Sequence, residues 1–137
     1  MNKTYKRVLI GIIIAAIVGI IAYRQVMRGH DDMAKAKPDI TIKAEELIKL
    51  YEEDEKNADN LFLGKILEIK GVVSLIESTD EEATITMEVD GYMGGIAFEL
   101  TNPEEADELH EEEYHVLKGK CSGKLTDVVI SRSVVVE

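Results

Sequence analysis

Apolar residues are distributed along this chain in three successive patterns. Residues 8–23 form an uncharged run of sixteen, VLIGIIIAAIVGIIAY. Residues 41–62 carry apolar side chains at helical spacing, with Glu and Lys between them. From residue 65 onward apolar and polar residues alternate, which is the period of a half-buried β-strand. The pattern therefore predicts an apolar N-terminal helix, then one or two amphipathic helices, then a strand-rich region.

The uncharged run at 8–23 has nearly the length of a membrane span. As a helix it covers about 24 Å, against a hydrocarbon core of about 30 Å. We therefore expect an uncleaved membrane anchor over residues 1–26. Residues that suit the membrane interface flank the run on both sides: Tyr5, Lys6, Arg7, Tyr23 and Arg24.

Two other interpretations of this run are weaker. A cleaved signal peptide also begins with an apolar run behind basic residues, but Ala22-Tyr23-Arg24-Gln25-Val26 offers no small-x-small cleavage pattern. A buried core helix would need apolar surroundings on every side, which one small domain does not provide.

The basic residues favour one orientation of the anchor. Three precede the span (Lys3, Lys6 and Arg7), whereas two follow it (Arg24 and Arg28). By the positive-inside rule we expect the amino terminus in the cytoplasm. The rest of the chain would then lie in a periplasm or at a cell surface.

Residues 27–40 lack periodicity, and we expect a linker there. Pro38 stops any helix that continues from the membrane. Residues 41–62 form one helix or two consecutive ones, and Asp54 is placed to cap the second. Residues 41–137 are thus expected to form a single domain of helices and strands.

Five alternating segments predict strands in the remaining chain. A short helix starting at Pro103 separates the third from the fourth. Gly71 invites a bulge or sharp bend in the long first strand, and turns are expected at Asp90-Gly91 and Ser122-Gly123-Lys124. This order is that of a five-stranded OB-fold barrel, here preceded by helices. The expected strands are 65–75, 83–89, 95–100, 114–121 and 127–136.

Several motifs in the domain resemble a known family. They are Tyr51-Glu-Glu-Asp54, Phe62-Leu-Gly64-Lys65, Ile69-Lys-Gly71-Val-Val73, Leu117-Lys-Gly119-Lys-Cys121-Ser-Gly123 and Asp127-Val128. From about residue 44 to residue 137 the chain resembles the tRNA-anticodon-like OB family of small bacterial envelope proteins. The resemblance implies an OB fold preceded by helices and held at the membrane by an anchor or a lipid. It implies no activity that can be transferred.

The part of the chain after His30 is strongly acidic. It holds eleven Lys and Arg against twenty-seven Asp and Glu, a formal balance of −16. Such a domain is repelled by nucleic-acid phosphates and by anionic lipid headgroups. OB domains that bind single strands carry aromatic and basic residues on the second and third strands. Here Tyr92 in the turn is the one aromatic placed to stack, so we expect no nucleic-acid binding. The outward residues of these strands are Thr84, Thr86, Glu88, Ala97 and Glu99.

No catalytic, metal or cofactor site is expected. His110 and His115 are five residues apart, so on a helix they point about 140° apart, unlike the i, i+4 pair of zinc proteases. The acidic clusters at 80–82 and 104–113 lack the spaced oxygens and glycine of a calcium loop. Cys121 has no partner and is expected as a small buried strand residue, with a reactive or intermolecular thiol as the alternative. We therefore expect that this protein is not an enzyme.

One local concentration of basic residues falls on the last two expected strands and the loop that joins them. Lys118, Lys120, Lys124 and Arg132 are either ordinary strand-surface residues or a docking patch for an acidic ligand. We expect a membrane-anchored binding or assembly module with a protein partner. The alternative is an oligosaccharide or small ligand, because OB loops also hold sugars. Tyr92 and Tyr114 are the aromatic residues that could stack on a sugar.

The apolar run also contains small residues at regular spacing. Gly11, Ala15 and Gly19 fall at intervals of four and form a ridge along one helix face. Such a ridge lets a second helix approach closely, so it predicts a homodimer through the anchor. Glycine and alanine are also frequent in membrane helices in general.

Overall fold

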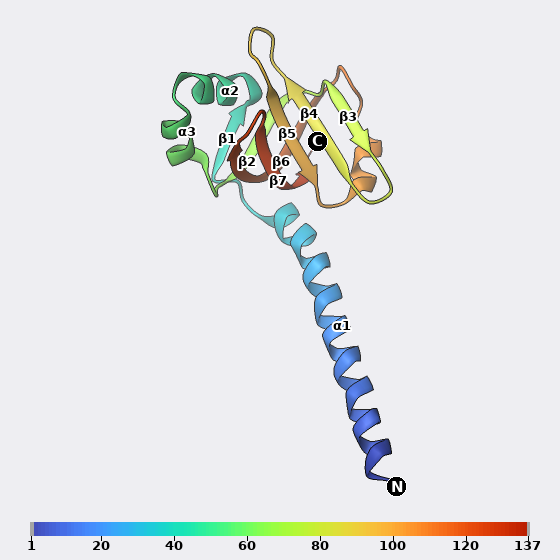
Figure 1. Ribbon diagram of the computed structural model, residues 1–137. Helices are drawn as coiled ribbons and strands as arrows, with labels where there is room; N and C mark the ends of the chain where they lie inside the picture. The colour runs from blue at the N-terminus through green and yellow to red at the C-terminus, as the bar shows by residue number, and fades with distance from the viewer. Residues whose placement is uncertain (1, 137) are drawn as a thin grey trace.

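A long N-terminal helix and a body of strands make up the chain, as Figure 1 shows. The computed structural model describes residues 2–136, with side chains described throughout that range except at 25–32. The elements are α1 (Lys3–Lys35), β1 (Ile40–Lys43), α2 (Ala44–Glu53), α3 (Glu55–Phe62), β2 (Ile66–Val72), β3 (Leu75–Ser78), β4 (Ala83–Glu88), β5 (Gly95–Leu100), the 3₁₀ helix η1 (Pro103–Glu108), β6 (Tyr114–Lys124) and β7 (Val128–Val135).

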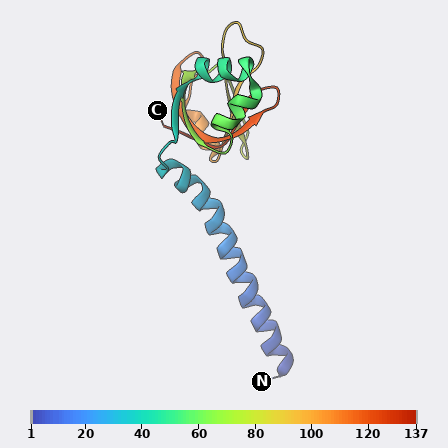
Figure 2. The same ribbon diagram turned by 90° about the vertical axis from the view of Figure 1, so that its left-hand side faces the viewer.

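Helix α1 contains the uncharged run and projects from the body (Figures 1 and 2). Residues Lys3–Arg24 have a mean hydropathy of 2.1, and none of this window is buried. A helix that is apolar on every side and has no protein cover is not a core helix. Its length and composition suit a membrane anchor or a signal sequence.

The backbone of α1 remains helical as far as Lys35. The expected aperiodic linker at 27–40 is therefore helical over most of its length, which corrects that prediction. The physical reason is that a proline disfavours helix at the residue before it but leaves the earlier turns free to form. The side chains of Arg28, Asp31 and Asp32 lie outside the described residues. The division of the chain at residues 26 and 40 stays a prediction.

The C-terminal end of α1 is attached to the sheet by Lys118 of β6. The Lys118 ammonium donates hydrogen bonds to the carbonyls of Ala34 (3.1 Å) and Ala36 (2.7 Å). The last carbonyls of a helix have no partners within the helix, and a cation there also interacts favourably with the helix dipole. Lys118 is buried, and so is Met33, the residue before Ala34. This contact holds the end of α1 against the domain.

The amphipathic segment forms two helices, which is one of the two predicted alternatives. Asp54 lies between α2 and α3, and its side chain accepts a hydrogen bond from the Asn57 N–H at 3.1 Å, so the predicted cap is confirmed. The expectation that the helix starts at residue 41 is wrong. Ile40–Lys43 is instead β1, which pairs in parallel with β2.

The strands form one sheet with the order β1-β2-β6-β7-β5-β4-β3. The expectation of five strands differs from this sheet in two places. β1 adds a strand beside β2, and the predicted first strand divides into β2 and β3 at Val73-Ser74, two residues after Gly71. The pairing has two ends, at β1 and β3, and does not close into the expected five-stranded barrel.

The predicted alternation is largely confirmed in the core. β5 spans Gly95–Leu100 as predicted, with Ile96, Phe98 and Leu100 buried. Leu67, Ile69 and Val73 also face the core, but Leu75, assigned to the same face, is 42% exposed. The reason is that the chain leaves the ladder after Val72 and enters β3 in a new register. The helix predicted at Pro103 is η1, capped by the Asn102 side chain.

The turn between the last two strands lies three residues later than predicted. β6 continues through Ser122-Gly123-Lys124, and β7 begins at Val128. Gly123 has a φ of +99°, which favours glycine, and it lies where the β6–β7 register shifts. A glycine of this kind marks a bulge inside a strand as readily as a turn. The connection is therefore formed by residues 125–127.

Candidate binding groove

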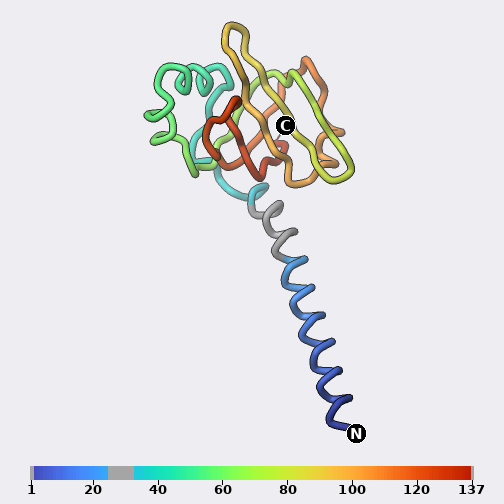
Figure 3. Tube along the Cα trace, viewed as in Figure 1, coloured from blue at the N-terminus to red at the C-terminus, as the bar shows by residue number. Residues whose placement is uncertain are grey.

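A groove of about 1080 Å³ lies where four elements meet. Its walls come from the start of α2, the end of β2, the β4–β5 loop and the start of β6. The β4–β5 loop lies at the end of the body opposite α1, as the tube in Figure 3 shows. The groove is lined by Lys43, Ala44, Glu45, Glu46, Lys49, Lys70, Gly71, Val72, Val73, Ser74, Glu88, Val89, Asp90, Tyr92, Glu112 and Tyr114.

Gly71 brings the first turn of α2 close to the sheet at the bottom of this groove. A Cβ atom at Gly71 would lie 2.8 Å from the Ala44 Cβ and 2.9 Å from the Met87 sulfur. Both distances are shorter than van der Waals contact. The absence of a side chain at Gly71 therefore sets the spacing between α2 and β2.

Large apolar side chains remain partly open to solvent in the groove. Val72 and Tyr114 are cross-strand neighbours in the β2–β6 ladder, and they are 49% and 61% exposed. Tyr92, from the β4–β5 loop, is 37% exposed. Amphipathic rings and a β-branched side chain in one concave surface offer contact area to a ligand.

The charged groups that line the groove are mixed in sign. Three lysines (Lys43, Lys49 and Lys70) stand against five carboxylates (Glu45, Glu46, Glu88, Asp90 and Glu112), a balance of −2. Among the side chains that the structure describes, none of these eight has an ion-pair partner within 4.0 Å. The groove therefore presents charges that are free to pair with a ligand.

The structure brings some of the predicted ligand-binding residues together and separates others. Tyr92 lines the groove, as does Tyr114. The expected outward face of β4 and β5 contains neither aromatic nor basic side chains, and its Thr86 is buried rather than exposed. This face is therefore a weaker candidate site than the groove.

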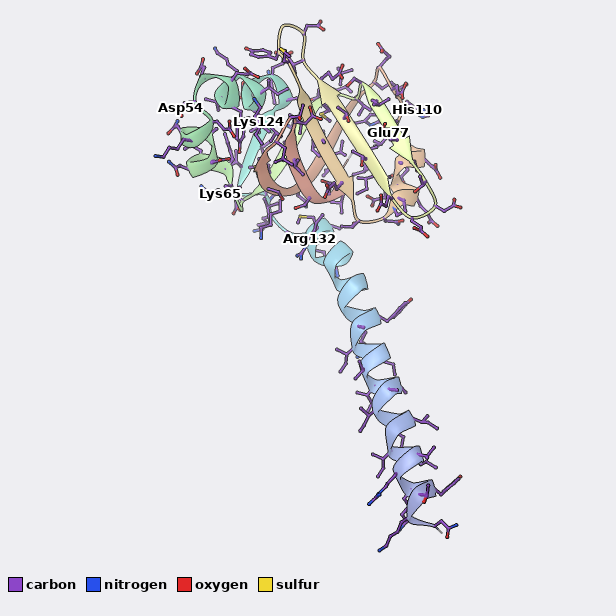
Figure 4. The ribbon with its side chains drawn as sticks, viewed as in Figure 1. Asp54, Lys65, Glu77, His110, Lys124 and Arg132 are labelled. Carbon is purple, nitrogen blue, oxygen red and sulfur yellow. The ribbon has the colours of Figure 1, made fainter. Side chains whose placement is uncertain are left out.

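The four basic residues of β6 and β7 do not form one patch. Lys118 bonds to the end of α1, and Lys124 pairs with Glu52 of α2 at 3.2 Å. Lys120 and Arg132 are exposed, and Arg132 has a φ of +51°. Figure 4 shows Arg132 next to the end of α1 and Lys124 on the side of α2. Two of the four are therefore already engaged within the protein.

Cys121 is buried and forms part of a polar group of three side chains, which agrees with its prediction as a buried strand residue. The Tyr51 hydroxyl lies 3.4 Å from the Cys121 sulfur and donates to the Asp59 carboxylate at 3.0 Å. Burial raises the pKa of Tyr51 well above its ordinary value of 10.0, and the interactions with Cys121 and Asp59 raise it further. The phenol therefore remains neutral, and this group stabilises the α2–β6 contact.

The two histidines that were not expected to bind zinc lie close together, His110 in the loop after η1 and His115 in β6. The His115 Nε2 accepts a hydrogen bond from the His110 N–H at 3.3 Å. Over the part of the chain that the structure describes, no group of three or more His, Cys, Asp or Glu side chains could hold a metal ion.

Sequence reasoning named two residues of the groove, Tyr92 and Tyr114, but missed the rest of its lining. Its apolar residues come from positions 72, 92 and 114, which are brought together by sheet pairing. One signal was available in the alternation, because Val72 interrupts the polar side of the first strand with a β-branched residue.

The fold and the groove together define a small domain that presents a concave surface on a sheet of OB type. The chain belongs to the tRNA_anti-like family, an OB-fold family whose model matches residues 1–135. This confirms the resemblance that the sequence motifs indicate. The curated proteins give no match to the chain.

A solved structure from Klebsiella pneumoniae subsp. pneumoniae MGH 78578 is similar in fold. It is described as a "putative nucleic acid-binding lipoprotein". The TM-score is 0.61 at 16% sequence identity, and the match covers 71% of this chain and 91% of the other. At this identity the similarity shows the shared fold.

Proposed function

We propose that this protein is a membrane-anchored binding module that holds a protein partner in the groove. The observation that carries the proposal is the set of three partly exposed apolar side chains, Val72, Tyr92 and Tyr114, in one concave surface. Tyrosines of this kind are enriched where proteins bind one another, because the ring supplies contact area and the hydroxyl a polar end. The module is proposed to act without catalysis.

The proposed location is outside the cytoplasm, with α1 as an uncleaved anchor and the amino terminus inside. Support comes from the apolar, uncovered window Lys3–Arg24 and from the lipoprotein of the same fold. Protease added to spheroplasts should digest the domain, and the intact protein should sediment with membranes. A soluble mature form that begins near residues 23–27 would overturn the anchor.

Site-specific photo-crosslinking in the producing cells tests the protein partner. A photoreactive amino acid is placed at Val72 in the groove and, as a matched control, at Glu77 on β3. Figure 4 shows Glu77 on the side of the sheet away from α2, and it is exposed. We expect a protein adduct at position 72 that is absent at position 77. Adducts of equal yield at both positions, or none at 72, would contradict the proposal.

An oligosaccharide is the second candidate ligand, and one observation favours it. Tyr92 and Tyr114 line the same groove, so both rings are available to one ligand. Carboxylates and lysines between them could bond to sugar hydroxyls. Binding on a glycan array that is abolished by Tyr92→Ala would favour this candidate over a protein.

Nucleic acid is a less favoured ligand. The five carboxylates of the groove outnumber its three lysines, and the chain after His30 carries a formal balance of −16. Both features repel phosphates. A filter-binding assay at low salt that shows micromolar affinity for any oligonucleotide would reverse this order.

Homodimerisation through the anchor is a further part of the proposal. Gly11 and Gly19 have open space around them in the single chain. A two-hybrid assay of the isolated span should lose signal when both become Ile, whereas Ile13→Leu with Ile20→Leu should have little effect. Equal signals from the two variants would mean that the small residues do not mediate association.

A further inference from the structure

We infer that the partner segment held in the groove is a cationic peptide with aromatic or aliphatic residues. This inference rests on the proposed function and specifies the chemistry of the partner. Two features of the groove, one apolar and one electrostatic, determine which class of polypeptide it fits.

The apolar feature is the contact surface formed by Val72, Tyr92 and Tyr114. Val72 and Tyr114 lie directly opposite each other in the ladder, so they form one continuous surface across two strands. About half of each side chain is accessible. Covering them requires an apolar group from the partner, because a polar group buried there without a hydrogen bond is destabilised. Aromatic and large aliphatic residues supply such a group at the centre of interfaces.

The electrostatic feature is the arrangement of carboxylates around this surface. Glu45 and Glu46 come from α2, Glu88 and Asp90 from β4 and its loop, and Glu112 from the segment before β6. They thus stand on three walls, and all are exposed and unpaired among the described side chains. A Lys or Arg beside the apolar anchor of the partner would find a carboxylate on any of these walls.

The charge of the whole domain acts in the same direction. The formal balance of −16 after His30 attracts a cationic segment over a distance and repels acidic ones. Lys43, Lys49 and Lys70 remain available to backbone carbonyls or to a single carboxylate of the partner. The combination selects against a purely polar polycation, which would leave the apolar surface uncovered.

Peptide binding to the full chain in phosphatidylcholine nanodiscs tests the inference. Three fluorescent peptides of equal length are compared, one with Lys and Phe, one with Glu and Phe, and one with Lys and Ser. We expect the Lys/Phe peptide to bind about tenfold more tightly than the other two, with an affinity that falls as salt is raised. Equal binding of the Glu/Phe or the Lys/Ser peptide would overturn the inference.

Charge reversal locates the site. Glu45→Lys with Glu46→Lys should weaken the Lys/Phe peptide about fivefold or more, whereas Glu77→Lys with Glu81→Lys changes the net charge equally and should have a smaller effect. An equal effect of both pairs would show binding to the overall charge and not to the groove. Because Glu45 and Glu46 also lie in the first turn of α2, Tyr114→Ala serves as a second variant. It should weaken the same peptide without changing the circular dichroism spectrum.

Competition separates the inference from the proposed function. The photo-crosslink at position 72 is repeated with excess Lys/Phe peptide. Loss of the protein adduct supports both proposals. An adduct that persists while the peptide fails to bind leaves the protein partner standing and overturns its cationic chemistry. Peptide binding without any cellular adduct would instead overturn the protein partner.

Discussion

The two ends of the β2–β6 pair use lysine in opposite ways. Near α1, Lys118 is buried and donates hydrogen bonds to the backbone carbonyls of Ala34 and Ala36. At the far end, Lys43, Lys49 and Lys70 line an open groove and have no ion-pair partner among the described side chains. A buried cation must be fully satisfied within the protein, whereas solvated cations remain available to other molecules. The comparison identifies the contact of Lys118 with the end of α1 as an attachment point and the groove as the candidate site.

Removing the Lys118 ammonium should have the largest effect. In Lys118→Met the carbonyls of Ala34 and Ala36 lose two charge-assisted donors, so we expect the free energy of unfolding to fall by about 2–3 kcal/mol. Trypsin should also cut faster after Lys35. The measurements are thermal unfolding and limited proteolysis of the full chain in detergent micelles.

Lys120→Met is the matched control for Lys118→Met, because Lys120 lies on the same strand with its side chain exposed. We expect its unfolding free energy to change by less than about 0.5 kcal/mol. Similar losses in both variants would show that the contact with α1 does not stabilise the domain.

Gly71→Ala should have the next largest effect, at the bottom of the groove. The new Cβ would meet Ala44 and Met87 within 2.9 Å, so α2 must move away from the sheet. We expect a loss of about 1–3 kcal/mol of unfolding free energy, as for overpacking in other cores. Urea unfolding would measure it. An unchanged midpoint would mean that the α2–β2 spacing is not tightly fixed.

Tyr51→Phe tests the polar group of Tyr51, Asp59 and Cys121 and should lower the unfolding free energy by about 1 kcal/mol, because the hydrogen bond from the phenol to Asp59 is lost. The raised pKa of Tyr51 also predicts a pH dependence. Above the unfolded value of about 10, the unfolded chain releases the phenolic proton while the folded chain keeps it. Stability from this residue is therefore present below pH 10 and falls as the pH rises further.

Ultraviolet titration of the folded protein would follow this difference. Tyr51 should contribute no phenolate absorbance until the protein unfolds, and Tyr51→Phe should leave the titration of the folded form unchanged. A reduced amplitude below the unfolding pH in the variant would contradict the assignment.

Tyr114→Ala should have the smallest effect on stability. Its side chain is 61% exposed, so we expect a change of less than about 0.5 kcal/mol in the unfolding free energy. The binding of a groove ligand should nevertheless weaken. A large loss of stability would mean that Tyr114 supports the sheet and is not kept for contact with a partner.

Local patterns in the sequence predicted the elements well where neighbouring residues decide the structure. Alternation located β5, and Asp54 identified the start of α3, because both depend on contacts within a few residues. β1 was missed because four residues in a parallel strand are stabilised by a partner 27 positions away. The five-stranded barrel failed for a similar reason, since the break after Val72 depends on contacts with distant segments.

The candidate site could be predicted only in part. Tyr92 and Tyr114 were identified as potential ligand contacts, whereas Val72 joins them through pairing across the sheet and the start of α2 through packing on it. The burial of Lys118 was missed for the same reason, because its sequence neighbours indicate a solvated strand lysine. Its burial follows from the position of the α1 end, which the alternating pattern of β6 does not encode.

Because the backbone of α1 is helical without a break, the number of residues in it determines the direction in which the groove faces. Lys35 lies eleven positions after Arg24 in the helix, a rise of about 16 Å along the axis. Because Lys118 fixes the end of this helix to β6, one inserted residue would swing the whole domain by about 100° around the axis. Seven inserted residues would return the domain to within about 20° of its original orientation about the axis. The length of this segment therefore sets both the direction in which the groove faces and its distance from the apolar part of α1.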